Sequence, residues 1–231
     1  MTARPLHLAL LGKGKTGAVV AVVAAERGHR TTILTGNENA NGAWLTLTNL
    51  QDVDAVIDFT TPEGVTANIA ACVAAKKPMV VGTTGWYKDL DRVRGEVEHA
   101  GSGFVFGANF SYGVNLFFQI ARAAAPALQH GYSGLITEVH HVHKKDAPSG
   151  TAAALRNVVA DVAGVQLEIA AEREGDVMGI HTLELASGGD RIILTHEVKS
   201  RRTFAEGAVL AAEWIVDKTG FYDFKDIFIR L

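Results

Sequence analysis

The sequence predicts the α/β fold class, with a doubly wound parallel sheet in a first lobe and a mixed or antiparallel sheet in a second, α+β lobe. Three observations carry this prediction. Short aliphatic segments alternate with helix-like segments over the first hundred residues, a glycine-rich turn follows the first of them, and the rhythm changes after about residue 108. Strands separated by helices of this length imply right-handed βαβ crossovers and a parallel sheet covered on both faces.

Five segments of the first lobe are rich in aliphatic or β-branched residues, which predicts strands over 6–11, 31–35, 55–59, 79–81 and 104–106. Three helices are predicted between them, over 16–28, 63–76 and 87–99. The second of these helices has the clearest start, because Pro62 and Glu63 follow two threonine hydroxyls, a pattern typical of a helix N-terminus. The polar residues 37–42 are expected to form a loop.

The second lobe combines apolar helices with β-branched segments. Its elements are predicted in the order helix 115–128, strand 135–143, loop 144–149, helix 151–163, strands 181–186 and 192–198, and helix 204–217. The two strands at 181–186 and 192–198 alternate in polarity around a short glycine turn, so they predict an antiparallel hairpin.

Composition excludes several classes of protein. Hydrophobic residues make up 48% of the 231 residues, enough for a substantial core, and 22 Lys and Arg against 25 Asp and Glu leave a net charge of −3. No whole-chain field therefore attracts nucleic acid or an anionic membrane. The single cysteine, Cys72, rules out an internal disulfide and a Cys-rich zinc site, and we expect it in the core of a protein of the reducing cytoplasm. The apolar run 6–11 is too short for a signal peptide or a membrane span.

A glycine-rich turn, Gly12-Lys13-Gly14-Lys15-Thr16-Gly17, lies between the first predicted strand and the first predicted helix and fits G-x-G-x-x-G. The first glycine permits a tight turn, the second lets a pyrophosphate approach the backbone, and the third lets the helix pack close to the strand. The N–H groups at the helix start then face the anion. A P-loop needs a glycine five positions before Gly14, where this chain has Ala9. The turn therefore predicts a Rossmann-like dinucleotide site.

An acid about 20 residues further on, at the end of the second strand, typically holds the ribose diol of NAD. Here Thr35 ends that strand, and the nearest acid, Glu38, is expected out in the loop. With no carboxylate to repel a 2′-phosphate, and with Lys13 and Lys15 nearby, we expect NADPH to be used at least as well as NADH. The alternative is that both lysines are merely solvated.

Two further turns follow strands of the expected sheet, Gly82-Thr83-Thr84-Gly85 and Gly107-Ala108-Asn109-Phe110. In an open parallel sheet the ligand lies outside the carboxyl ends of the strands. Hydroxyls and backbone groups in these turns are expected to bind the ribose and carboxamide of a dinucleotide. The alternative is that each segment is only a tight connection between elements.

The densest chemistry lies between Glu138 and Thr151, in the run His140-His141-Val142-His143-Lys144-Lys145. In a regular strand His141 and His143 share one face while His140 faces the other, so all three converge on a metal only through a kink. The two adjacent lysines also oppose a cation. A metal site and a purely structural role for the histidines stay open as alternatives.

Acid chemistry beside an anion pocket is the sharper interpretation of this segment. Ser149-Gly150-Thr151 directly precedes a helix, so N–H groups and hydroxyls face whatever binds there, and the lysines add positive charge. Such a pocket suits a substrate that bears carboxylates. A histidine beside it can protonate a carbon or nitrogen centre after hydride transfer, because imidazole titrates near neutral pH. Arg201 either lines this pocket or ends a solvated strand.

The segment from Glu138 to Ala152 closely resembles the signature of the dihydrodipicolinate reductase family. The resemblance extends over nearly the whole chain, including the glycine turn and the segments 82–84, 109–115, 200–201 and 204–208. It implies an oxidoreductase that reduces 4-hydroxy-tetrahydrodipicolinate to tetrahydrodipicolinate with NADH or NADPH, in the biosynthesis of diaminopimelate and lysine.

The resemblance also implies roles for individual residues. His140 is expected as the proton donor and Lys144 as a second donor that engages the substrate, with no metal involved. The substrate carboxylates are then held by His141, Ser149, Gly150 and Thr151. The chain departs from the family at Lys15 and Thr16, where arginine and methionine are usual, and at Thr35, where an acid is often found.

The resemblance also implies which part of the chain forms each domain and what each domain binds. Residues 1–108, completed by 204–231, are expected to bind the dinucleotide, and residues 109–203 to bind the substrate and build a homotetramer. Two other functions stay open at this point. One is a metal-dependent hydrolase that uses the histidine cluster, and the other is a non-catalytic regulator that senses a dinucleotide.

Overall fold

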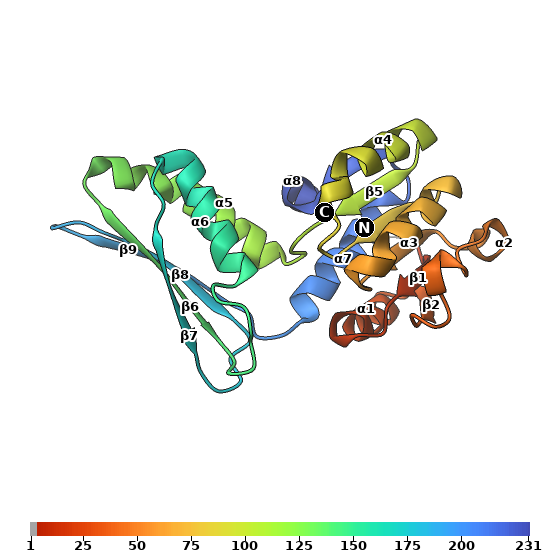
Figure 1. Cartoon of the computed structure of the whole chain (residues 1–231), viewed down its shortest axis with the longest axis horizontal. Coiled ribbons are helices and arrows are strands. Elements are labelled where there is room, and N and C mark those ends of the chain that lie inside the picture. Colours follow the sequence, from red (N-terminus) through yellow and green to blue (C-terminus); the bar gives the residue numbers. More distant parts are fainter. Residues whose placement is uncertain (1–3) are drawn as a thin grey trace. The chain divides into compact units, whose positions relative to one another are not determined.

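The computed structural model describes residues 4–231, which form two compact units (Figure 1). Residues up to 112, together with 201–231, form the first unit, and residues 113–200 form the second. The C-terminal segment therefore belongs to the same unit as the N-terminal part of the chain. The roles expected for the domains 1–108 with 204–231 and 109–203 stay predictions.

The first unit is built on a six-stranded parallel sheet with the order β10-β5-β4-β3-β1-β2. Its strands are β1 (His7–Leu11), β2 (Arg30–Leu34), β3 (Ala55–Asp58), β4 (Met79–Val81), β5 (Gly103–Phe106) and β10 (Gly220–Asp223). Every pairing is parallel, as βαβ crossovers require. The five strands expected in this lobe are confirmed with small shifts of their ends. The sixth, β10, was not predicted and lies at the edge beside β5.

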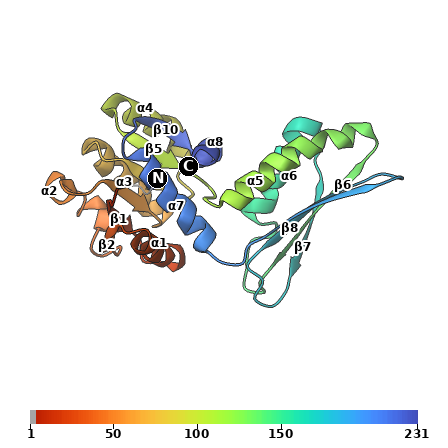
Figure 2. The same cartoon turned by 180° about the vertical axis from the view of Figure 1, so that it is seen from behind.

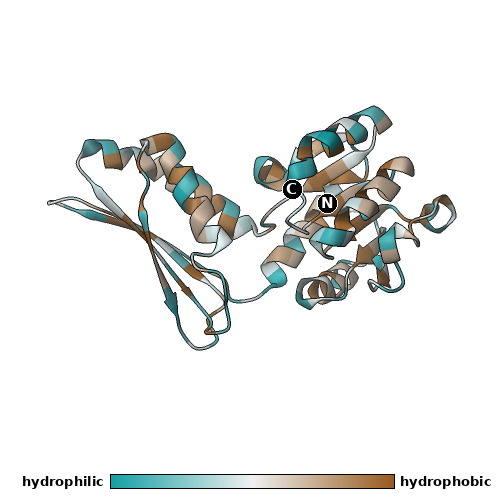
Figure 3. Cartoon of the chain, viewed as in Figure 1, coloured by the Kyte–Doolittle hydropathy of each residue, from teal (hydrophilic) through white to brown (hydrophobic). Residues whose placement is uncertain are grey.

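Helices cover both faces of this sheet (Figure 2). They are α1 (Lys15–Glu26), α2 (Leu47–Leu50), α3 (Pro62–Ala74), α4 (Leu90–Ala100), α7 (Arg202–Ile215) and α8 (Phe224–Ile227). Successive residues of β1 point to opposite faces, so Leu8 and Leu10 pack in one apolar cluster with α1 and α7. Ala9 and Leu11 pack in a second cluster with α3 and α4. Burial on both faces explains why the central strands β1, β3, β4 and β5 consist mostly of apolar residues, which Figure 3 colours brown.

The second unit contains a four-stranded mixed sheet in the order β7-β6-β8-β9. Its strands are β6 (Ser133–His140), β7 (Glu168–Arg173), β8 (Ile180–Ala186) and β9 (Arg191–Glu197). β6 pairs in parallel with β7 and antiparallel with β8, and β8 and β9 form the expected hairpin. Helices α5 (Tyr112–Ala124) and α6 (Gly150–Ala163) cover one face, because Phe117 and Leu155 share an apolar cluster with Ile136 and Leu183. The predicted fold class is therefore confirmed.

Several predicted elements differ from the structure in their bounds. The strand expected over 135–143 ends at His140. The helix expected over 115–128 runs instead to Ala124 and continues as a 3-10 helix, η3 (Ala125–His130), because Pro126 has no N–H for the α-helical pattern.

Three further short elements of the structure, two 3-10 turns and one strand, were not predicted. The helix expected over 87–99 begins with a 3-10 turn, η2 (Tyr87–Asp89), and the loop expected over 37–42 contains another, η1 (Ala40–Gly42). β7 was not predicted, because its sequence EIAAER has little β-branched character. Within residues 4–231, no helix is both long enough and apolar enough to cross a bilayer.

Candidate active site

The glycine turn between β1 and α1 has the geometry that its sequence pattern implies. Gly12 has a φ of +95°, and a Cβ atom there would lie 2.3 Å from the carbonyl oxygen of Phe59. A Cβ atom on Gly17 would lie 2.1 Å from the carbonyl oxygen of Gly12, whereas nothing lies within 4 Å of the same position on Gly14. Packing therefore requires the first and third glycines, and the second faces open space in which an anion can approach the backbone.

Three adjoining pockets run along the carboxyl ends of the parallel strands. The first has a volume of about 360 Å³ and is lined by Gly14, Lys15, Thr16, Gly17, Phe59, Thr60, Pro62, Gly82, Thr83, Thr84 and Arg201. The second shares Thr60 with it and reaches Gly12 and Thr35. The third shares Gly82 with it and is also lined by Gly107, Ala108, Asn109 and Phe110. The pockets bring together every predicted cofactor residue except Lys13, which lines none of the three.

Two of the predicted cofactor residues also serve the internal structure of the unit. The Thr83 hydroxyl donates to Asp58 at 2.7 Å and accepts the N–H of Thr60 at 2.8 Å. Phe110 is buried, with its ring centroid 4.6 Å from that of Phe224. For Arg201 the sequence left two interpretations open, a residue of the anion pocket or a solvated strand end. In the structure Arg201 is half-buried and lines the first pocket of the first unit.

Glu38 lies in the exposed loop after β2, as expected, but its carboxylate folds back onto Thr35. Its Oε2 atom accepts hydrogen bonds from both the N–H and the hydroxyl of Thr35, each at 2.7 Å. Both bonds lower the pKa of the Glu38 carboxyl, and the bond from the Thr35 backbone contributes more than the bond from its hydroxyl. A carboxylate therefore stands at the end of β2, where Rossmann-type sites hold a ribose diol.

Asp58 was not singled out from the sequence, yet it organises the loops around the first two pockets. Its carboxylate is fully buried and accepts hydrogen bonds from Thr60, Thr83 and Asn68 at 2.7–2.9 Å. Asn68 on α3 in turn accepts the side-chain amide of Asn39 at 2.8 Å. One buried carboxylate thus connects the loops that follow β2, β3 and β4.

The successive histidines of the second unit separate at the end of β6. His140 is the last residue of the strand and is 6% exposed, whereas His141 is half-buried and His143 is exposed. The ring of His140 packs against His181 of β8, with centroids 5.0 Å apart. Because the strand ends at His140, the following residues are released from the strict alternation of faces.

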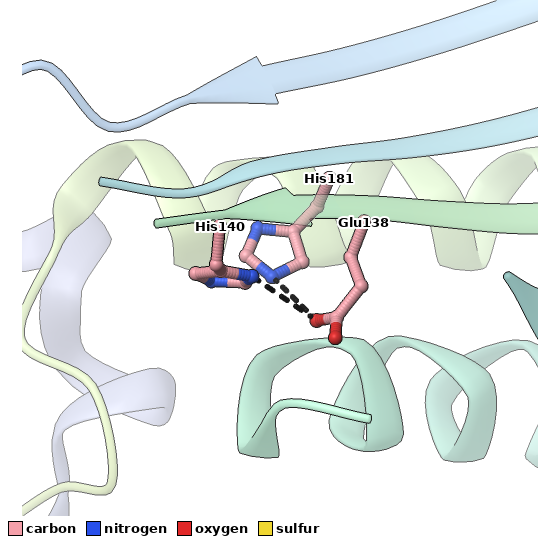
Figure 4. Close-up of side chains that lie close together, drawn as sticks. All are labelled: Glu138, His140 and His181. Carbon is pink, nitrogen blue, oxygen red and sulfur yellow. Dashed lines mark ion pairs between the residues drawn. The ribbon is translucent and has the colours of Figure 1, made fainter. Parts of the chain in front are cut away.

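His140 forms one buried group with Glu138 and His181, two residues that sequence analysis did not place in the site (Figure 4). The Oε2 atom of Glu138 lies 3.5 Å from Nδ1 of His140 and 3.7 Å from Nε2 of His181. Glu138 and His140 are two residues apart on β6, and Glu138 pairs directly with His181 on β8. All three side chains therefore share one face of the mixed sheet.

Ser149, the residue that precedes α6, is turned into the protein. It is 2% exposed, and its N–H donates to both carboxylate oxygens of Glu138, at 3.0 and 3.1 Å. Its hydroxyl oxygen accepts the N–H of Ala152 at 3.1 Å and lies 3.1 Å from Nε2 of His181. Ser149 is therefore the N-cap of α6, and its polar groups are engaged inside the protein.

The other predicted substrate residues are more accessible. Gly150 is exposed, and Thr151 and Lys144 are half-buried. The Lys144 ammonium donates to both oxygens of Asp146, at 2.8 and 2.9 Å. An ammonium has three N–H groups, so this pairing leaves Lys144 able to bind a further anion.

Arg173, at the end of β7, connects the lysine loop to the buried group and was not predicted either. Its guanidinium donates to the carbonyl oxygens of Lys144 and Asp146, at 3.4 and 2.6 Å. It also reaches Oε1 of Glu138 at 3.5 Å. Arg173 pairs with His140 across the parallel strands β6 and β7, which explains why a residue so distant in sequence lies here.

Burial lowers the pKa of both buried histidines. For His140, burial is the main cause, and the negative charge of Glu138 opposes it. The pKa of His181 is lowered to about 4, mainly by burial and secondly by the charge of the nearby His140. At neutral pH His181 is therefore a neutral imidazole.

The group of Glu138, His140 and His181 has donor atoms of the type that bind a divalent metal, all within 4.8 Å of one another. The carboxylate, however, already accepts the N–H of Ser149 on both oxygens and faces the guanidinium of Arg173. A cation there would compete with a resident positive charge, so this arrangement does not favour the hydrolase alternative.

Comparison with known proteins connects both units to one family. The model described as dihydrodipicolinate reductase, N-terminus, matches residues 7–110, and the one described as dihydrodipicolinate reductase, C-terminus, matches residues 113–228. The 4-hydroxy-tetrahydrodipicolinate reductases of Christiangramia forsetii and Neisseria meningitidis serogroup B are each 36% identical to the chain, over 96% of it and 97% of their own length.

Solved structures agree with this assignment at the level of the fold. The dipicolinate-bound dihydrodipicolinate reductase from Paenisporosarcina sp. TG-14 has a TM-score of 0.81 to this chain at 20% sequence identity, and the match covers 96% of this chain and 99% of that one. The chain therefore has the fold of such a reductase over nearly its whole length. The chain belongs to the dihydrodipicolinate reductase family.

Proposed function

We propose that the chain is an oxidoreductase that reduces 4-hydroxy-tetrahydrodipicolinate to tetrahydrodipicolinate with NADH or NADPH, in the biosynthesis of diaminopimelate and lysine. The observation that carries this proposal is the match of both family models, over 7–110 and 113–228. Relatives that bear the reductase name match the chain over 96% of its length.

The residues of the first unit fit a dinucleotide. Gly14 leaves its backbone open to a pyrophosphate at the start of α1, and Lys15 and Arg201 add positive charge to the same pocket. Thr35 and the loop 107–110 lie at the two ends of the row of pockets, where they would hold the adenosine ribose and the nicotinamide. When bound, the cofactor supplies the hydride.

The residues of the second unit fit a substrate with two carboxylates. We assign His140 as the proton donor and Lys144 as a second donor that also binds the substrate. Gly150 and Thr151 supply N–H groups at the first turn of α6, and His141 adds a half-buried imidazole. Ser149 supports this turn from inside by capping the helix.

The proposal is tested by following the loss of reduced-cofactor absorbance. The purified chain is mixed with NADH or NADPH while the upstream synthase supplies the substrate. Substrate-dependent oxidation supports the proposal, and cofactor binding without oxidation would favour a sensing regulator instead. Activity that disappears with a chelator and returns with zinc would favour a metal-dependent enzyme.

We further propose that the chain assembles as a homotetramer through the uncovered face of the mixed sheet. This face carries Leu135 and Ile193, which are 37% and 48% exposed in the single chain. Exposed apolar residues on a sheet face favour association with another copy. Light scattering is expected to give the mass of four chains, and Ile193→Glu is expected to reduce it. A wild-type chain that stays a monomer at assay concentration would contradict this assembly.

A further inference from the structure

Glu138 is a fully buried carboxylate to which the proposed reaction assigns no role. A buried charge is costly unless it is paired and hydrogen-bonded. Glu138 meets this requirement through the N–H of Ser149, at 3.0 and 3.1 Å, and the guanidinium of Arg173, at 3.5 Å. His140 and His181 complete its surroundings. The carboxylate therefore stands at the point where the proposed acid and the proposed anion-binding turn meet.

The contacts of Glu138 join four segments that are distant in sequence. Ser149 begins α6, whose first turn carries the proposed carboxylate-binding residues. Arg173 holds the carbonyl oxygens of Lys144 and Asp146 and so fixes the loop that carries the second donor. A change at Glu138 is expected to move the lysine loop and the helix start together, because both are attached to the same carboxylate.

The imidazole of His140 is confined on both sides. Its Nδ1 atom faces Oε2 of Glu138 at 3.5 Å and has no hydrogen-bond partner in residues 4–231. On the other side, Nε2 lies so close to Gly179 that a Cβ atom there would come within 2.9 Å of it, so the ring occupies this position only because residue 179 has no side chain. Since Nδ1 faces the carboxylate, we assign Nε2 as the nitrogen that donates the proton.

The neutral imidazole of His181 holds Ser149 in place by donating a hydrogen bond to its hydroxyl oxygen. Nε2 of His181 lies 3.1 Å from the Ser149 hydroxyl oxygen, and Nδ1 is buried without a partner within the described part of the chain. An unpaired acceptor nitrogen is less costly to bury than an unpaired N–H, so the proton belongs on Nε2. In this tautomer His181 donates to Ser149 and stabilises the cap of α6.

We propose that Glu138 and His181 are positioning residues, which hold the His140 imidazole and the carboxylate-binding turn of α6 at a fixed spacing through Ser149. This inference rests on the proposed function. Neither residue needs to contact the substrate. Glu138 acts on the acid and on the helix start, and His181 acts on the helix start through the Ser149 hydroxyl.

The charge of Glu138 has a second consequence for His140. The titratable groups that face this imidazole are Glu138, His181, Lys144, Asp146 and Arg173. Glu138 favours the protonated imidazole, which is the form that donates a proton. Turnover therefore falls as pH rises through the pKa of His140, and removal of the Glu138 charge moves this fall to lower pH.

Glu138→Gln keeps the size of the side chain and an acceptor for Ser149 but removes the charge. We expect kcat to fall about tenfold, with the KM for NADPH unchanged, and the falling limb of the kcat profile to move about one pH unit lower. Glu172→Gln, an exposed position on β7, is the matched control and is expected to keep the wild-type profile.

His181→Gln preserves an N–H group near the position of Nε2, whereas His181→Leu removes it. We expect His181→Leu to lose about tenfold in kcat/KM for the substrate, and His181→Gln to restore most of that loss. Equal losses in both variants would show that the residue serves only packing and would overturn its positioning role.

A titration of the His140 ring by NMR, in the chain without substrate, separates this inference from the proposed function. A lower pKa of His140 in Glu138→Gln than in wild type supports the role of Glu138 even if the substrate is a different one. An unchanged pKa together with an unchanged kcat profile would overturn it, whereas an inactive wild-type chain with a shifted pKa would contradict only the proposed function.

Discussion

The two units build their parts of the proposed site by different means. In the first unit the proposed pyrophosphate site is formed by the backbone, because Gly12 and Gly17 permit a tight turn and Gly14 leaves space for an anion beside it. In the second unit a buried carboxylate, Glu138, collects side chains and N–H groups from separate strands and a helix start. The glycine turn of the first unit is thus a shaped backbone, whereas the group around His140 in the second unit is a network of side chains.

This difference determines what a substitution can do. A backbone site is sensitive to added volume, since a single Cβ atom collides with a carbonyl oxygen. A side-chain network is sensitive to the loss of charge or of one donor, since a buried partner is then left unpaired. Substitutions in the first unit are therefore expected to change folding stability or cofactor binding, and those around Glu138 to change turnover.

The largest expected effect is on turnover, from His140→Gln. The variant retains polarity and size but cannot donate a proton as imidazolium, so kcat is expected to fall about 10²–10⁴-fold. Steady-state kinetics measures kcat, and fluorescence titration with NADPH is expected to give a wild-type Kd. His143→Gln, at an exposed position three residues on, is the control. Turnover near the wild-type value in His140→Gln would remove the assigned acid.

Two substitutions separate the two roles of the glycine turn: Gly17→Ala tests its packing, and Gly14→Ala tests its binding of the cofactor. The new Cβ at Gly17 meets the carbonyl oxygen of Gly12 at 2.1 Å, so a loss of about 1–3 kcal/mol in the free energy of unfolding is expected. Gly14→Ala adds a Cβ in open space and is expected to unfold like wild type but bind NADPH at least about tenfold more weakly. Urea denaturation and cofactor titration measure both, and wild-type affinity in Gly14→Ala would contradict the binding role.

Asp58→Ala tests whether a side-chain network also supports the first unit. The substitution leaves the buried donors of Thr60, Thr83 and Asn68 without their acceptor, which is expected to cost about 1–3 kcal/mol in the free energy of unfolding. Asp52→Ala, an exposed position before the same strand, is expected to have no measurable effect. Equal stability of the two variants would show that these loops hold their shape without Asp58.

The smallest expected effect is on the choice of cofactor. Glu38 accepts two hydrogen bonds from Thr35, and its charge would repel a 2′-phosphate bound there. Glu38→Gln is expected to raise the ratio of NADPH to NADH efficiency by about fivefold, a small effect because the charge is exposed to solvent. Glu98→Gln on α4 is the control. A tenfold or larger preference of the wild type for NADH would overturn the expectation that NADPH serves at least as well.

The local sequence predicted the regular elements well where their character is strong. The strands β1 to β5 follow aliphatic or β-branched runs, and α3 begins at Pro62, one residue before the predicted start, although the Thr61 side chain makes no capping hydrogen bond. β7 and β10 were missed because their short sequences, EIAAER and GFYD, become strands through pairing with β6 and β5. A residue in such a strand is stabilised by partners that no local pattern contains.

The same contrast applies to the site residues. By itself the sequence determined the fold class, the glycine turn, the turns after β4 and β5, and the segment from His140 to Thr151, because each depends on neighbouring residues along the chain. Only the tertiary structure decided that Glu38 folds back onto Thr35, that Asp58 connects three loops, and that Arg173 and His181 surround Glu138. Glu38 reaches Thr35 through the local turn of its loop, whereas strand register and helix packing bring the groups around Asp58 and Glu138 together from separate elements. The need to pair these two buried carboxylates then selects their partners.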